Sequence, residues 1–118
     1  MKKYLFLIVI LFQIACKNKE QTNVVVLPSI DSGKQLFETN NCAACHQTAE
    51  KVVGPSLTTI AQIYHLKNAS IVSFLKAEAE PIVDPSQYQS MKLNLEITKT
   101  MSTPELQSLE LYIMQYAK

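Results

Sequence analysis

The chain has 118 residues, with 11 Lys, no Arg, 10 acidic residues, three Cys and two Gly. That length accommodates one domain and excludes a large multidomain enzyme. The near-neutral charge lacks the basic footprint of a nucleic-acid-binding protein, and two glycines are too few for a Gly-rich loop that binds phosphates.

The first fifteen residues have the layout of a secretory signal peptide. Lys2 and Lys3 form a short basic start, and an almost unbroken apolar run follows over residues 4–14. A transmembrane helix needs about 20 apolar residues, so this run is short for a span and matches the apolar core of a signal peptide. The alternative is an uncleaved N-terminal anchor. We expect residues 1–15 to be a signal peptide and the protein to be exported.

Cys16 follows the small residue Ala15, where a signal peptidase would cut. The run from Gln13 to Cys16 resembles a bacterial lipobox, although Gln13 replaces the usual Leu. The resemblance implies a lipidated Cys16 and a periplasmic protein anchored to a membrane, with residues 16–30 as a tether. Lys17, in place of an Asp retention signal, slightly favours the outer membrane. The alternative is a plain signal peptide with an incidental cysteine.

Residues 42–46 read Cys-Ala-Ala-Cys-His, which is the C-x-x-C-H attachment motif of c-type haem. The two thiols, Cys42 and Cys45, can add to the two vinyl groups of one porphyrin as thioethers. The adjacent imidazole of His46 can then turn to the iron as an axial ligand. The motif predicts one covalent haem c.

Three other readings of the two cysteines fit the sequence less well. A thioredoxin-like pair sits on a βαβ pattern, and no strand pattern precedes Cys42. A zinc site needs about four ligands, and beyond the motif only His65 remains in the predicted domain. A disulfide between Cys42 and Cys45 would be short and strained. With one cysteine for lipid and two for haem, none is left unassigned.

The rest of the chain has helical periodicity and no convincing strand, so we expect an all-α domain at residues 31–118. Three helices are predicted before residue 80: from a cap at Asp31 or Ser32 to Asn40, from Ser56 to His65, and from Asn68 to Ala79. Their apolar faces contain Gly33, Leu36 and Phe37, then Leu57, Ile60, Ala61 and Tyr64, then Ile71, Val72, Phe74 and Leu75.

A fourth and last helix opens with Ser102-Thr103-Pro104-Glu105, a capping box with proline in the first turn. We expect Leu106, Leu109, Ile113 and Tyr116 on its buried face and Tyr112 at the edge. Residues 81–100 show no strong helical stripe and are expected to form a loop.

This order of features resembles the class I monohaem cytochrome c family over residues 31–118. The resemblance rests on Gly33 and Phe37 in the first helix, the CAACH motif, the run that starts at Gly54-Pro55, and a Met-bearing loop before the last helix. It implies a small four-helix fold around one covalent haem, in which Gly33 and Phe37 meet Leu109 and Tyr112. It also implies that the Pro55 carbonyl binds the far ring nitrogen of His46. Gln47 stands where glycine is common, and no proline follows Met91.

Four side chains could be the sixth ligand of the iron: Met91, Met101, Met114 and His65. Met114 lies inside the last helix, opposite its predicted buried face. Met101 precedes the helix cap, where it can pack on Leu106 as a hydrophobic staple. His65 ends a helix and is expected to be solvated. Met91 has no competing role and lies where the family has its axial methionine, so we expect Met91 to be the ligand.

A haem iron with two strong axial ligands has no open position for a substrate, so we expect an electron carrier of a respiratory chain and not an enzyme. Two alternatives remain: a haem enzyme or gas sensor with an open sixth position, and a fixed haem subunit of a larger oxidoreductase. The expected partners are redox proteins and, through the lipid, a membrane. We expect a monomer that binds no nucleic acid.

Overall fold

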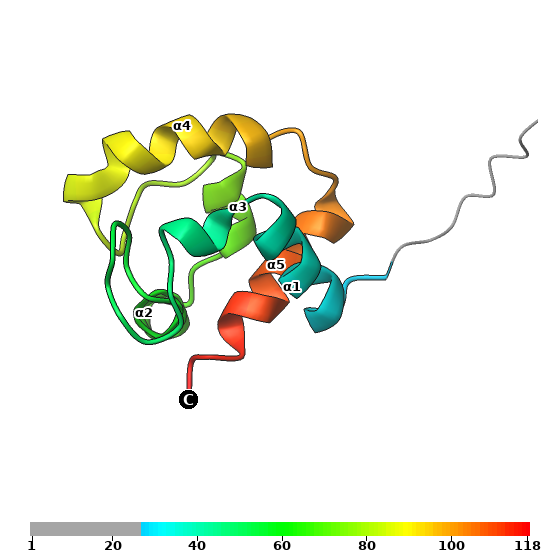
Figure 1. Cartoon of the computed structure of the whole chain (residues 1–118), viewed down its shortest axis with the longest axis horizontal. Helices are drawn as coiled ribbons and strands as arrows, with labels where there is room; N and C mark the ends of the chain where they lie inside the picture. The colour runs from blue at the N-terminus through cyan, green and yellow to red at the C-terminus, as the bar shows by residue number, and fades with distance from the viewer. Residues whose placement is uncertain (1–26) are drawn as a thin grey trace, which may run out of the picture.

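The computed structural model describes residues 27–118, and Figure 1 shows this part of the chain as a bundle of short helices. The predicted signal peptide, Cys16 and most of the predicted tether lie outside the described residues. In chain order the helices are α1 (Ile30–Thr39), the 3₁₀ turn η1 (Cys42–Ala44), α2 (Leu57–Leu66), α3 (Ile71–Leu75), the 3₁₀ turn η2 (Pro85–Gln87), α4 (Tyr88–Thr98) and α5 (Thr103–Met114).

The all-α prediction is confirmed, and residues 27–118 contain five α-helices where the sequence indicated four. No strand forms within these residues, apart from an isolated antiparallel bridge between His46 and Lys51. Each helix in the same range is too short or too polar to span a bilayer.

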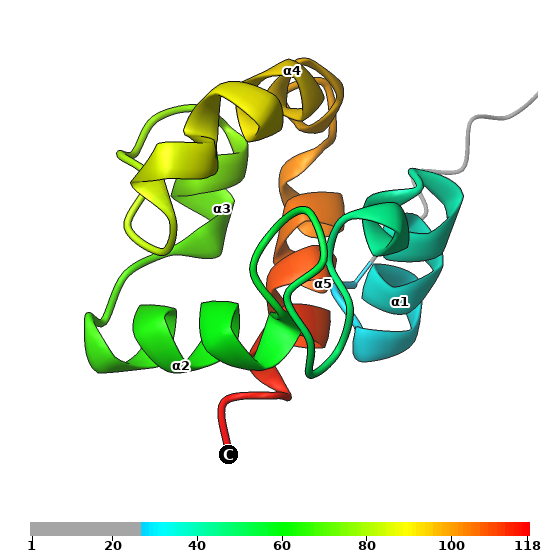
Figure 2. The same ribbon diagram turned by 60° about the vertical axis from the view of Figure 1, so that its left-hand side comes forward.

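The first and last helices cross at close range, and α5 also packs against α2 and α3. Figures 1 and 2 both show α1 beside α5. Gly33 permits this approach, because a Cβ there would lie 1.9 Å from the Ser108 carbonyl oxygen and 2.8 Å from Tyr112 Cβ. The rings of Phe37 and Tyr112 pack with centroids 5.3 Å apart. The predicted contact with Tyr112 is thus confirmed, and Ser108 is an additional neighbour.

The N-cap of α1 is Ser29, and the prediction of Asp31 or Ser32 was wrong by two or three residues. The Ser29 hydroxyl accepts a hydrogen bond from the backbone N–H of Ser32 at 3.1 Å. The Ser29 N–H in turn donates to Ser108 Oγ at 3.2 Å, which joins the start of α1 to α5. The helix therefore begins at a serine whose side chain caps α1 and whose backbone N–H forms a hydrogen bond with α5.

Helix α2 begins after Ser56 as predicted, whereas α3 is much shorter than residues 68–79. Ser70 caps α3, so the helix cannot extend back to residue 68. Ala77 has a left-handed backbone, with φ of 59°, which stops the helix before residue 79. The Glu110 carboxylate of α5 accepts the backbone N–H of Ile71 at 2.7 Å and fixes the start of α3.

The capping box of α5 is present as predicted: Glu105 accepts hydrogen bonds from the backbone N–H and the hydroxyl of Ser102, both at 2.7 Å. The assignment of two tyrosines was reversed. Tyr112 is buried in the core, and Tyr116 is half-buried and meets Tyr112 edge to face. The Phe37 ring of α1 covers Tyr112, which is why the stripe of α5 alone did not identify it.

The expectation of a loop over residues 81–100 was wrong, because α4 occupies Tyr88–Thr98. Only Leu95 and Thr98 of this helix are buried, and one of them is polar. Figure 1 shows α4 along the outside of the domain. A helix that presents so few apolar side chains to the core has no apolar stripe in its sequence.

Candidate haem site

An apolar pocket lies at the centre of residues 27–118, and every helix described above contributes to its wall. The deepest apolar side chains come from α1, α2, α3 and α5, and they include Phe37, Leu57, Ile71 and Leu109. Asp84 is the one residue with a charged side chain among those that line it. Such a pocket suits a large, mainly apolar ligand with few polar groups.

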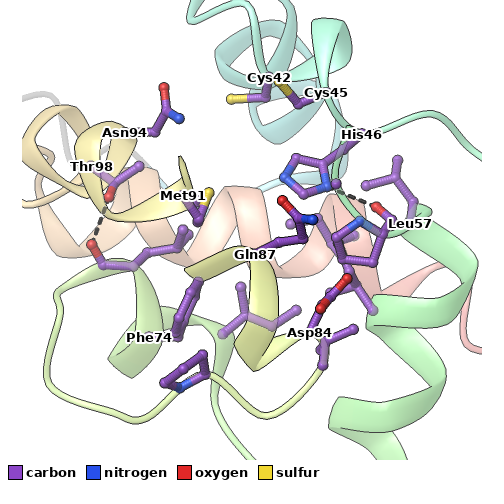
Figure 3. Close-up of a pocket in the computed structure, with 18 of the residues that line it drawn as sticks. Cys42, Cys45, His46, Leu57, Phe74, Asp84, Gln87, Met91, Asn94 and Thr98 are labelled. Atoms are coloured by element: carbon purple, nitrogen blue, oxygen red, sulfur yellow. Dashed lines mark hydrogen bonds between the residues drawn. The ribbon is translucent and has the colours of Figure 1, made fainter. Parts of the chain in front are cut away.

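The two cysteines lie at the edge of this pocket as half-buried free thiols, not as a disulfide (Figure 3). Asn41 has a left-handed backbone, with φ of 58°, and turns the chain from α1 into η1. The 3₁₀ turn then carries Cys42, and Cys45 ends it. Burial raises the pKa of the Cys42 thiol, so the sulfur is kept as a neutral thiol in its apolar surroundings.

His46 projects into the same pocket, and its ring is fixed by its neighbours in the loop. Its Nδ1 lies 2.7 Å from the carbonyl oxygen of Pro55. Since a carbonyl oxygen only accepts, Nδ1 carries the proton and donates it, and Nε2 is left with its lone pair free for a metal. The bond predicted between Pro55 and His46 is confirmed.

The loop of residues 47–56 places Gly54 in close contact with the His46 ring. A Cβ on Gly54 would lie 2.4 Å from His46 Cε1, so only glycine fits there without moving the ring. The Gly54 N–H donates to the Cys45 carbonyl at 3.0 Å, and the Leu57 N–H donates to the Gln47 carbonyl at 2.9 Å. These bonds fix the loop, so the departure at Gln47 does not prevent the bond to Pro55.

Of the four candidates for the sixth ligand, only Met91 lines the pocket. Figure 3 shows its side chain projecting into the pocket from α4, which lies across from the segment that carries His46. Met101 and Met114 are half-buried and pack against the apolar core, and His65 is exposed. The structure thus brings Cys42, Cys45, His46, Pro55 and Met91 around one space.

Sequence reasoning missed the polar residues that the segment of η2 and α4 contributes to this site, which are Asp84, Gln87, Ser90, Asn94 and Thr98. Three and seven residues separate Asn94 and Thr98 from Met91, which is the spacing of one helical face. Recognition of α4 would have placed them beside Met91. Thr98 donates to the Leu75 carbonyl at 2.6 Å and thereby ties the end of α4 to α3.

Tyr64 contributes its ring to the pocket wall. Its burial, together with the charge of Glu110, raises the pKa of its phenol to about 12. The phenol therefore remains neutral at physiological pH, and it provides an apolar ring with one polar end.

Comparison with known families settles the class of protein, because residues 30–117 match the family described as cytochrome c. The chain belongs to the cytochrome c family. No curated protein matches it significantly. The family assignment, together with the C-x-x-C-H motif, implies one covalent haem c in this cytochrome. The site fits that group: an apolar pocket, two free thiols at its edge and an imidazole with a free Nε2.

The protein is therefore a cytochrome c of the electron-carrier type, with redox proteins as its partners. The haem supplies an iron that changes between Fe(II) and Fe(III). The protein's contribution is the apolar pocket and the orientation of His46 and its neighbours, which influence how the two oxidation states differ in free energy.

Proposed function

We propose that this protein is a membrane-tethered monohaem cytochrome c that carries single electrons in a respiratory chain, with iron ligated by His46 and Met91. In this proposal Cys42 and Cys45 form the thioethers to the haem. The observation that carries it is that His46, with Nε2 free, and Met91 line one apolar pocket from different segments.

His/Met ligation would give this cytochrome the properties of an electron carrier. A thioether sulfur is a soft ligand that favours Fe(II), so it raises the reduction potential relative to two histidines. With both axial positions filled by the chain, no position is open to a substrate or a gas. The apolar wall excludes water, which limits reorganisation when the charge changes.

The proposal of a tether rests on the N-terminal sequence. The basic start, the apolar run and Cys16 after Ala15 resemble a lipoprotein signal. Acyl chains on Cys16 would anchor the domain to a membrane in the periplasm, with the outer membrane slightly favoured. More than one acyl chain gives stable anchoring, whereas a single chain is marginal. We further propose that the domain acts as a monomer.

Replacement of the proposed ligand tests the assignment of the iron site. Met91→Ala should abolish the far-red sulfur-to-iron band of the ferric protein and open the iron to imidazole or CO. Its potential should fall, because the preference of the thioether for Fe(II) is lost. Absorption spectra and a potentiometric titration of the haem-loaded protein measure both effects.

Two control variants separate ligation from packing. Met101→Ala should keep the far-red band and lose about 1–2 kcal/mol of unfolding free energy, less than a fully buried methionine, because Met101 is half-buried. His65→Ala should change neither property, since His65 is exposed. Loss of the band in Met101→Ala but not in Met91→Ala would reverse the assignment. A high-spin wild type that binds CO readily would favour the enzyme or sensor alternative.

A further inference from the structure

The segments that carry the two proposed axial ligands are joined by one ion pair. Among the hydrogen bonds and ion pairs of residues 27–118, only Lys51 Nζ to Asp84 Oδ2, at 2.6 Å, joins residues 40–56 to residues 81–98. Lys51 belongs to the loop of His46 and pairs with it in the isolated β-bridge. Asp84 immediately precedes η2, which leads directly into α4 and Met91.

The other contacts of α4 near this end are apolar, because Tyr88 and Met91 pack against the hydrophobic core. In the described part of the chain, the backbone of α4 comes close to η2, which directly precedes it, and makes few close approaches to the other helices. The ring of Tyr88 packs near Phe74, with centroids 6.3 Å apart. At the far end, Thr98 bonds to the Leu75 carbonyl. The position of the start of α4, where Met91 lies, therefore depends on this apolar packing and on the short segment that contains Asp84.

Asp84 can fix this segment relative to the loop of His46, because its carboxylate is held in place by hydrogen bonds. Its side chain is only 16% exposed, and in Figure 3 it projects, with Gln87, from the segment that leads into α4. Its Oδ1 accepts a hydrogen bond from Ser86 Oγ at 2.6 Å. The bonds from Lys51 and Ser86 lower the pKa of the Asp84 carboxyl, so it is ionised near neutral pH.

We propose that the Lys51–Asp84 ion pair positions Met91 on the iron and limits its replacement by an external ligand. The inference rests on the His46/Met91 ligation proposed above. When Met91 leaves the iron by movement of the start of α4 away from the loop of His46, the ion pair must break. The free energy of the pair therefore adds to the cost of that opening.

The expected change in imidazole affinity depends on how exposed the ion pair is to solvent. The Lys51 side chain is 58% exposed, so water and salt screen the pair. Exposed ion pairs correspond to a change of about two- to five-fold in an equilibrium constant. Loss of the pair should thus tighten imidazole binding to the ferric protein by about two- to five-fold.

The experiment is a titration of the haem-loaded ferric protein with imidazole, followed by the loss of the far-red band. Asp84→Asn and Lys51→Met should each bind imidazole more tightly than the wild type. The charge-swapped double variant Lys51→Asp/Asp84→Lys should restore much of the wild-type value. Added salt should tighten imidazole binding in the wild type and have a smaller effect in Asp84→Asn.

Lys99→Met provides a matched control. It removes another 2.6 Å ion pair of α4, Lys99–Glu96, which is local to the end of that helix. Imidazole affinity in Lys99→Met should equal that of the wild type. An equal rise in Lys99→Met and Asp84→Asn would overturn the proposal, because any weakening of α4 would then suffice.

The outcomes also separate this inference from the proposed ligation. A wild type that shows the far-red band, with an Asp84→Asn variant of unchanged imidazole affinity, would refute the role of the ion pair alone. A wild type without the band would refute ligation by Met91, and the positioning role with it.

Discussion

Replacement of Gly54 by alanine should displace the ring of His46, the proposed axial ligand. The new Cβ would lie 2.4 Å from His46 Cε1 and 2.8 Å from Nδ1, whereas ordinary contacts begin at 3.4 Å. The ring must therefore move by about 1 Å at Cε1, or the loop must lift. Either movement strains the 2.7 Å bond from Nδ1 to the Pro55 carbonyl.

The expected loss of unfolding free energy combines opposing effects. Overpacking costs about 1–3 kcal/mol, and a weakened hydrogen bond costs about 1 kcal/mol. Alanine restricts the unfolded chain and returns about 0.4–1 kcal/mol. Gly54 has no positive φ, so backbone strain adds nothing. We expect Gly54→Ala to lose about 1–3 kcal/mol.

The same substitution should also raise the reduction potential. The bond to Pro55 increases the basicity of the imidazole, which favours Fe(III), and its loss removes that preference. A difference of about 1 kcal/mol between the oxidation states corresponds to about 40 mV. Unfolding in guanidinium followed by circular dichroism, and potentiometry of the haem-loaded protein, measure the two effects.

Gly33→Ala is the matched control, because it adds the same methyl group at the other glycine. Its Cβ would meet the Ser108 carbonyl at 1.9 Å, so α1 and α5 must separate. Stability should fall by about 2 kcal/mol or more, but the potential should stay near the wild-type value because Gly33 does not line the pocket. A Gly54→Ala protein with wild-type stability and potential would refute the reasoning, and so would an equal shift of potential in Gly33→Ala.

Three further predictions concern attachment, anchoring and pH. Haem should remain on the wild-type chain through a denaturing gel, and Cys45→Ala should weaken that attachment; release of most haem from the wild type would contradict a covalent link. Labelled palmitate should appear on the wild type and be absent from Cys16→Ser, whereas a fully soluble, unlabelled wild type would argue against lipidation. Hydrogen bonds from Ser102 lower the pKa of Glu105, so the ionised carboxylate stabilises the fold above the usual glutamate pKa, and this is lost as pH falls through the lowered value. Glu105→Gln should therefore cost about 0.3–1 kcal/mol at neutral pH and much less in acid, as measured by denaturant unfolding at both.

The sequence by itself predicted the attachment motif for one haem c, and it placed four helix starts to within three residues. The C-x-x-C-H motif is contiguous, so its chemistry does not depend on how distant segments meet. Ser56 and the box of Ser102 and Glu105 are local signals too, because a cap binds backbone groups within the next turn. The position of Gly33 in α1 likewise predicted a close crossing, since its lack of a side chain is visible in the sequence.

Only the tertiary structure decided the form of the segment that carries Met91. Helix α4 was missed because its inner face contains Met91, Asn94 and Thr98, which face a cofactor pocket instead of apolar side chains of the chain. An apolar stripe in a sequence indicates a helix face that packs against other parts of the protein. The inner face of α4 lies largely against the pocket, so it leaves no such stripe. The ion pair of Lys51 and Asp84 was missed for a different reason. The two residues are 33 positions apart, so they give no local signal and meet only when the fold brings the loop and η2 together.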